Sequence, residues 1–105
     1  MDYVRGELAK VGAADRSIWV TEVGYSSDPG VQFEPSYQGG AKAQAQWLRD
    51  MLPYLLNELG LQKVFWFTLI DRPNAPSTFA KHGLLDADLA PKPAVDAYKA
   101  LIAGR

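Results

Sequence analysis

The sequence contains no cysteine and a single histidine, His82. A disulfide framework and thiol chemistry are therefore excluded, and a zinc site built on cysteines or on several imidazoles is not expected. Neither sign of charge dominates, because eleven basic and twelve acidic residues are scattered along 105 residues and give a net charge of -1. This balance argues against nucleic acid as the main partner and against binding to an acidic membrane surface. We expect no metal and no cofactor.

Long apolar runs are also missing. No stretch approaches the roughly 20 apolar residues that a membrane-spanning helix needs. Residues 1–5 lack the basic and then apolar pattern of a signal peptide, so none is expected, and the compartment stays open between cytoplasm and periplasm. With 48% hydrophobic residues, the composition is that of one globular domain with a modest core.

The spacing of apolar residues predicts helices that alternate with strands. The expected elements are, in order, helix 2–11, strand 17–24, loop 26–40, helix 41–59, strand 62–70, loop 71–91 and helix 93–103. The long helix should bend at Pro53, which has no amide hydrogen to donate. Alternation of this kind predicts a parallel α/β architecture, and long loops after both strands are typical of a barrel with functional loops at one end.

Two strands are too few for an isolated sheet, because each would keep an exposed edge. Strand 62–70 is almost continuously apolar, which is typical of a strand covered on both faces. We therefore expect a piece of a larger structure. It is either part of a longer protein or a unit of which several copies complete the sheet.

Glu22 is a carboxylate near the end of the strand Ile18–Tyr25, among Ile, Trp and Val. Burying an unpaired carboxylate is costly, and active sites of parallel α/β proteins assemble at the carboxyl ends of the strands. A catalytic carboxylate is therefore the first hypothesis; the alternative is a structural carboxylate paired with an Arg or Lys. Regular alternation would place Ile18, Val20 and Glu22 on one face.

Four motifs follow one another along nearly the whole chain: 18–24 (IWVTEVG), 44–48 (QAQWL), 65–71 (FWFTLID), and 82–86 (HGLLD) with 91–94 (PKPA). In this order they resemble the seventh strand, the helix after it, the eighth strand and the closing segment of the (β/α)8 barrels of glycoside hydrolase clan A. The resemblance implies that residues 1–105 form the last quarter of such a barrel together with the preceding helix. A complete barrel needs about 250 residues, so the resemblance implies that most of it lies outside this sequence.

The resemblance also implies roles for individual residues. Glu22 would be the nucleophile of a retaining glycosidase, and Trp66 would form a flat platform for a sugar ring, with a non-proline cis peptide just after it. The alternative for Trp66 is a core aromatic. Asp71 is expected to anchor a loop or bind a hydroxyl group, with a role as second carboxylate less favoured. Tyr25 is expected either to form a hydrogen bond near Glu22 or to be half-buried, and His82 to be a surface or hydrogen-bonding residue rather than a catalyst. Together with Trp66 and Asp71, both are candidate substrate-binding residues.

The clan's acid/base Glu has no counterpart, since no Asn-Glu pair ends a strand in this sequence. The expected function is accordingly a piece of a retaining glycoside hydrolase that is inactive by itself. A second hypothesis is a module, derived from a glycosidase, that binds carbohydrate or assembles without catalysis. A third is a small open α/β domain unrelated to glycosidases, which would need a complete sheet of its own.

Overall fold

The structure is a computed structural model that describes residues 2–30, 37, 39–77 and 79–104. Its elements are α1 (Asp2–Lys10), β1 (Trp19–Val23), α2 (Ala41–Pro53), the π-helix η1 (Tyr54–Glu58), β2 (Lys63–Trp66) and α3 (Pro93–Ala103). The predicted alternation of helices and strands is confirmed. The part of the first long loop at 31–36 and 38 lies outside the described residues. None of the helices in the described ranges is long and apolar enough to cross a bilayer.

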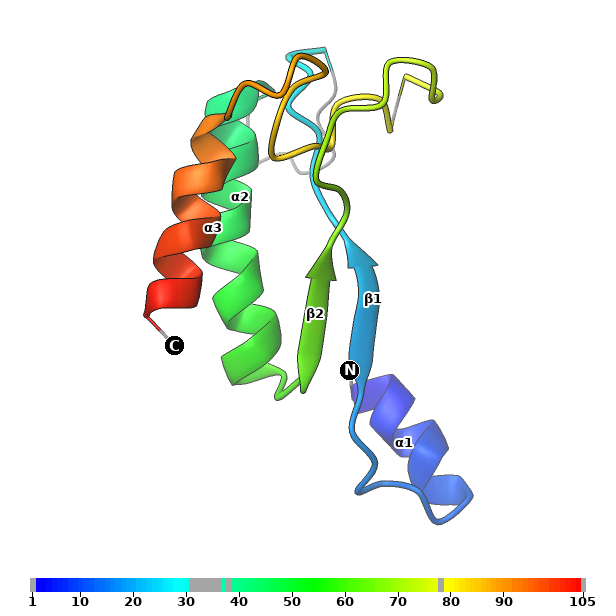
Figure 1. The fold of residues 1–105 in the computed structure, drawn as a ribbon. Helices are drawn as coiled ribbons and strands as arrows, with labels where there is room; N and C mark the ends of the chain where they lie inside the picture. Colours follow the sequence, from blue (N-terminus) through cyan, green and yellow to red (C-terminus); the bar gives the residue numbers. More distant parts are fainter. Residues whose placement is uncertain (1, 31–36, 38, 78, 105) are drawn as a thin grey trace.

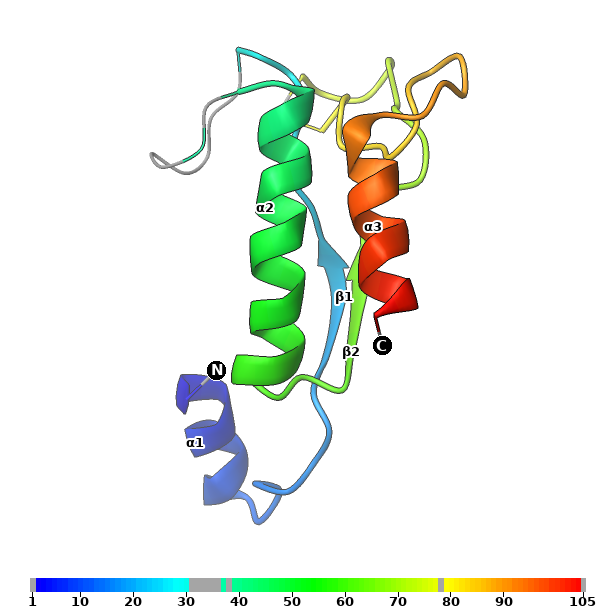
Figure 2. The same ribbon diagram turned by 90° about the vertical axis from the view of Figure 1, so that its left-hand side faces the viewer.

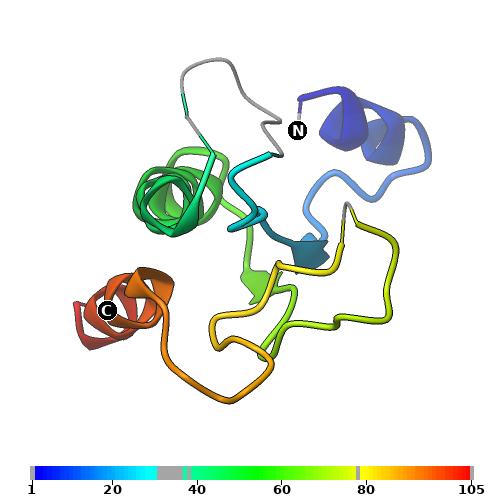
Figure 3. The same cartoon turned by 90° about the horizontal axis from the view of Figure 1, so that it is seen from above.

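The two strands form a parallel pair, and α2 and α3 pack side by side against one face of it (Figures 1 and 2). The loops that follow β1 and β2 gather at the carboxyl ends of the strands, which is the end of the molecule that Figure 3 views from above. Helix α1 lies at the other end, beyond the start of β1 and apart from the two packed helices (Figure 1). The arrangement is an unclosed α/β unit, a part of a barrel.

The hydrophobic core lies between the helices and the strand pair. Its buried members are Ala45, Leu48, Leu52, Leu84, Ala94 and Ala97, and Val23, Val64 and Trp66 pack against them from the strands. Ala45, Leu48 and Leu52 form one apolar stripe along α2, which faces this core. The two alanines of α3 have small side chains, which allows α3 to pack closely against α2.

The long helix does not stay α-helical to residue 59, as the sequence suggested. Regular α-helix ends at Pro53, and the chain continues as the wider turn η1, in which the amide of Leu59 donates to Tyr54 O over 3.0 Å. Pro53 has no amide hydrogen, so the bond to the carbonyl four residues earlier cannot form there. The proline therefore changes the winding of the helix, and π-turns of this kind often mark such a break.

The second strand is shorter and more exposed than expected. It ends at Trp66, and a cis peptide bond joins Phe67 to Thr68. Beyond this bond, Ile70 forms an isolated β-bridge with Leu85. The prediction that this strand is covered on both faces is wrong. Phe65 is 47% exposed, because both packed helices lie on one side of the pair and the described residues place nothing on the other.

A β-bulge interrupts β1. Trp19 pairs with Lys63 and Val20 with Val64, but the next pair is Val23 with Trp66, so three steps along β1 match two along β2. A bulge of this kind resets the alternation of side chains. Val20 and Val23 therefore both turn to the side of the helices, and Glu22 stays on the side that the helices leave open.

Candidate functional site

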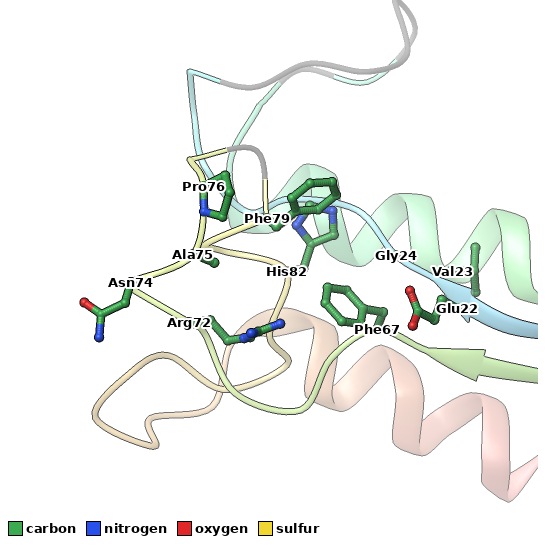
Figure 4. A pocket seen from close by; sticks show the side chains of 10 residues that line it. All are labelled: Glu22, Val23, Gly24, Phe67, Arg72, Asn74, Ala75, Pro76, Phe79 and His82. Atoms are coloured by element: carbon green, nitrogen blue, oxygen red, sulfur yellow. The ribbon is translucent and has the colours of Figure 1, made fainter.

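An open cavity of about 680 Å³ lies at the carboxyl ends of the two strands (Figure 4). The end of β1 supplies one wall, and the segment after β2 supplies the others. Its lining residues are Glu22, Val23, Gly24, Phe67, Arg72, Asn74, Ala75, Pro76, Phe79 and His82. Parallel α/β folds bind their ligands at this end of the strands.

Glu22 brings a carboxylate to this cavity (Figure 4). The expectation that it sits in a buried strand is wrong, since Glu22 is exposed in the described structure. The expectation that it shares a face with Val20 is wrong as well, because the bulge separates the two. The carboxylate is thus exposed to water on the open side of the sheet, and the cost of burying a charge does not arise.

Trp66 does not face Glu22. Its indole packs on the core side, edge-to-face with Trp47 at a ring distance of 6.1 Å, and its Nε1 donates to His82 O over 3.2 Å. The structure thus agrees with the alternative for Trp66, a core aromatic. The aromatic ring that lines the cavity beside Glu22 is Phe67, and the cis peptide follows Phe67, one residue later than expected.

Gly24 allows the two strands to approach each other above the bulge. A Cβ atom at this position would lie 2.3 Å from the carbonyl oxygen of Phe67 and 3.0 Å from Cδ2 of His82. The amide of Phe67 also donates to Val23 O over 2.7 Å. Close backbone contact therefore places Phe67 and His82 directly beside the strand that carries Glu22.

His82 forms the floor of the cavity and is only 6% exposed. Its ring lies 6.1 Å from that of Phe67 and 5.8 Å from that of Phe79. Burial lowers the pKa of His82 below its ordinary value of 6.5; Lys92 lowers it further, and Asp71 opposes them. The imidazole is therefore mainly neutral at pH 7 and can donate or accept hydrogen bonds. The expectation of a surface residue is wrong, since His82 is buried.

The lowered pKa of His82 predicts a loss of stability in mild acid. Because the unfolded chain takes up the proton first, the free energy of unfolding should fall as the pH drops from about 6.5 toward the lowered pKa of the folded state. Urea denaturation between pH 7.5 and pH 5 measures this slope. The variant His82→Gln should flatten it, and an unchanged slope in that variant would assign the effect to other groups.

Asp71 and Tyr25 lie outside the cavity. Asp71 accepts from Lys92 Nζ at 2.5 Å and from the amide of Gly83 at 2.9 Å, so it anchors a loop, as the favoured expectation had it. Tyr25 is fully buried and stacks on Trp47 at 5.4 Å, which places it against α2 rather than beside Glu22. Neither residue contacts the cavity in this structure.

Lys92 and Gln44 hold the loops above the strands. Lys92 Nζ also donates to Ser27 Oγ over 2.8 Å, and thereby joins the loop after β1, the loop after β2 and the start of α3. The buried amide of Gln44 donates to the carbonyl oxygens of Tyr25, over 3.0 Å, and Gly83, over 3.1 Å. The cavity thus rests on two side chains that each bind both loops.

Several cavity residues were not anticipated from the sequence, among them Phe67, Arg72 and Phe79. Phe67 belongs to an almost continuously apolar run, whose pattern does not show which rings face the open side, and Phe79 lies in a loop without periodicity. Arg72 had a usable signal, because it is a charged residue two positions after the predicted strand 62–70. Across the described ranges, no three of the His, Asp and Glu residues come together as a metal site would require.

The sequence matches the family model of the glycosyl hydrolase catalytic core over residues 2–98. No curated protein matches it significantly. Among solved structures, a GH2 β-galacturonidase from Eisenbergiella tayi superposes with a TM-score of 0.73 at 18% identity, over 99% of this chain and 20% of that one. A family 17 β-1,3-glucanosyltransferase from Rhizomucor miehei superposes with a TM-score of 0.61 at 23% identity, over 89% of this chain and 34% of that one.

A β-glucuronidase from Bifidobacterium dentium gives a TM-score of 0.68 at 15% identity, over 98% of this chain and 17% of that one. At these identities the likeness concerns the fold. The chain spans between 17% and 34% of the length of these three structures.

Proposed function

The chain belongs to the glycosyl hydrolase catalytic core family, and from this premise we propose that Glu22 is the nucleophile of a retaining glycosidase site that acts on a β-linked glycoside. The observation that carries the proposal is the position of Glu22, at the carboxyl end of β1 and in the wall of the cavity (Figure 4). The face of Phe67 offers an apolar surface beside it for the C–H side of a sugar ring.

In this reaction a carboxylate oxygen of Glu22 attacks the anomeric carbon of the sugar. A glycosyl ester forms, the bond to the leaving group breaks, and a second carboxyl group protonates the departing oxygen before activating water. That second group should lie about 5 to 5.5 Å from the nucleophile. Among the described lining residues Glu22 is the one acid, and Asp71 is bound to Lys92. The described residues therefore supply no such acid, and we expect that the isolated chain does not hydrolyse glycosides.

The proposal predicts covalent labelling of Glu22 without turnover. A 2-deoxy-2-fluoro-β-glycoside with a dinitrophenolate leaving group needs no proton on departure, so the missing acid does not prevent the first step. We expect mass spectrometry to find the sugar on the peptide that contains Glu22, and none in the variant Glu22→Gln. Ordinary aryl glycosides should give no measurable hydrolysis.

The matched control is Glu58→Gln, which changes an exposed glutamate on η1 far from the cavity and should leave labelling intact. Labelling that persists in Glu22→Gln would refute the role of Glu22. Robust hydrolysis of an ordinary glycoside that Glu22→Gln abolishes would refute the inactivity of the isolated chain.

A second candidate function is carbohydrate binding without catalysis. It is favoured by the lining itself, in which the rings of Phe67, Phe79 and His82 meet a single carboxylate. Sugar binding that survives Glu22→Ala but is lost in Phe67→Ala would favour carbohydrate binding without catalysis over the proposed catalytic role of Glu22. Trp66→Ala does not discriminate between the two, because Trp66 supports the core.

We further propose that residues 1–105 are the last quarter of a (β/α)8 barrel with the preceding helix, completed by further strands of the same polypeptide or by further chains. The open side of the strand pair exposes Trp19 and Phe65, and both outer strand edges lack a partner strand in the described structure. Exposed apolar sheet faces and free edges favour association. Light scattering should therefore find multimers; a stable monomer at high concentration would contradict completion by further copies.

A further inference from the structure

Arg72 stands on the loop that forms the outer wall of the cavity. This loop, the described part of residues 72–80, is closed at its base by the amide of Arg72, which donates to Ala80 O over 2.8 Å. Inside it, the amide of Ala75 donates to Arg72 O over 2.9 Å, and that of Phe79 to Pro76 O over 2.8 Å. The backbone of Arg72 is therefore fixed by two hydrogen bonds, and its side chain is free to serve the cavity.

The guanidinium of Arg72 has no partner in the described part of the chain. The ion pairs there join Lys10 to Glu7 and Lys92 to Asp71, and no hydrogen bond involves the Arg72 side chain. In Figure 4 the Phe67 ring stands between this guanidinium and the Glu22 carboxylate. Arg72 is thus not used to neutralise Glu22.

Arg72 is also the one cation among the described lining residues. His82 is neutral at pH 7, because burial lowers its pKa below 6.5. The cavity therefore presents a carboxylate, the three rings of Phe67, Phe79 and His82, and one positive group whose five donors have no partner among the described residues. A neutral sugar needs no such charge, whereas an anionic sugar would be repelled by Glu22 unless a cation offset that repulsion.

We propose that Arg72 makes this cavity selective for anionic sugars, whose carboxylate or sulfate group binds the Arg72 guanidinium. The proposal rests on the proposed function, since it takes the cavity of Glu22 as a sugar site. A guanidinium presents two parallel N–H groups that match the oxygens of a carboxylate, and such charge-assisted bonds are stronger than those to a hydroxyl group. The alternative is an arginine that only keeps the loop hydrated, as most exposed arginines do.

Binding measurements on three small sugars separate these readings. NMR titration of the full chain would compare methyl β-D-glucuronide, glucose 6-sulfate and neutral methyl β-D-glucoside. We expect one or both anionic sugars to bind about fivefold to tenfold more tightly than the neutral sugar at low salt. That preference should shrink in 0.5 M salt, because an exposed charge pair is screened. If the glucuronide binds more tightly than the sulfated sugar, the recognised group is a carboxylate; the opposite order indicates a sulfate.

The variant Arg72→Gln should remove the preference, so that the anionic sugar and methyl β-D-glucoside bind within about twofold of each other, because the charged contact is lost. Arg49→Gln is the matched control, since Arg49 is exposed on α2 and outside the cavity, and it should keep the preference. Because the Arg72 side chain has no partner in the described ranges, the spectrum of Arg72→Gln should remain that of a folded chain.

Two failures are distinguishable. Equal binding of neutral and anionic sugars, unchanged by Arg72→Gln, would overturn the role of Arg72 and leave the sugar site intact. No binding of any of the three sugars at tens of millimolar would overturn the sugar site and this inference together. A preference that persists in Arg72→Gln would assign anion binding to another group.

Discussion

Replacing Lys92 with methionine should lower the free energy of unfolding by about 3 kcal/mol, because removal of one partner leaves the other charge buried and uncompensated. Lys92 and Asp71 are 9% and 10% exposed, and their contact is the centre of the loop anchor described above. Methionine keeps most of the volume of the aliphatic part of the lysine side chain. The loss of stability should therefore come from the Asp71 carboxylate, which loses its counter-charge, and from Ser27 Oγ, which loses its donor. Such a loss is a large fraction of the stability of a domain of this size.

Urea denaturation followed by circular dichroism measures this change. The double variant Asp71→Asn with Lys92→Met should cost less than the two single changes added together, because it removes both charges of the pair. Lys10→Met breaks the exposed pair with Glu7, in which the side chains are 71% and 47% exposed, and should change stability by less than about 0.5 kcal/mol. A cost for Lys92→Met as small as that would show that the buried pair is not an anchor.

Gly24→Ala should destabilise the chain by about 3 kcal/mol, at the upper end of the usual cost of overpacking, because the new methyl group meets backbone. The carbonyl oxygen of Phe67 lies 2.3 Å from the position of that Cβ and cannot move without opening the contact between the two strands. The change should also push Phe67 and His82 away from Glu22, so labelling of Glu22 should fall even where the chain remains folded.

Gly6→Ala is the matched control for this substitution. Gly6 lies within α1, and a Cβ there meets no atom within 4 Å. Alanine is the better helix former, so this change should stabilise α1 by up to about 1 kcal/mol if it has any effect. Thermal unfolding of both variants checks the pair of predictions. Similar melting temperatures for Gly24→Ala and the native chain would mean that the two strands can separate at no cost.

The order of the elements could be predicted because each one has a local signal. The stripe of Ala45, Leu48 and Leu52 specifies a helix that must bury one face, and the β-branched and aromatic residues after Gln62 specify a strand. The position of Glu22 at a strand end also followed from the sequence. These properties depend on neighbours along the chain, so one sequence contains them.

The direction of the side chains in the site could not be predicted in the same way. It depends on a bulge in β1 that appears only when β1 and β2 are paired, and this bulge leaves Glu22 on the face opposite to Val23 and its partner Trp66. The anchor of Asp71 joins residues 21 positions apart through Lys92, which no local pattern reveals. Solvent exposure of the apolar strand was missed because the sequence pattern assumes that both faces are covered.

The buried amide of Gln44 has a consequence for local opening of the molecule. One side chain binds the loop after β1 at Tyr25 and the segment after β2 at Gly83, so neither can detach while that amide stays in place. The first turn of α2 and both loops should therefore exchange their amide hydrogens as one cooperative unit. Helix α1, which has no buried residue and is held by bonds from Arg5 to the carbonyl oxygens of Leu59 and Gly60, should open separately and first.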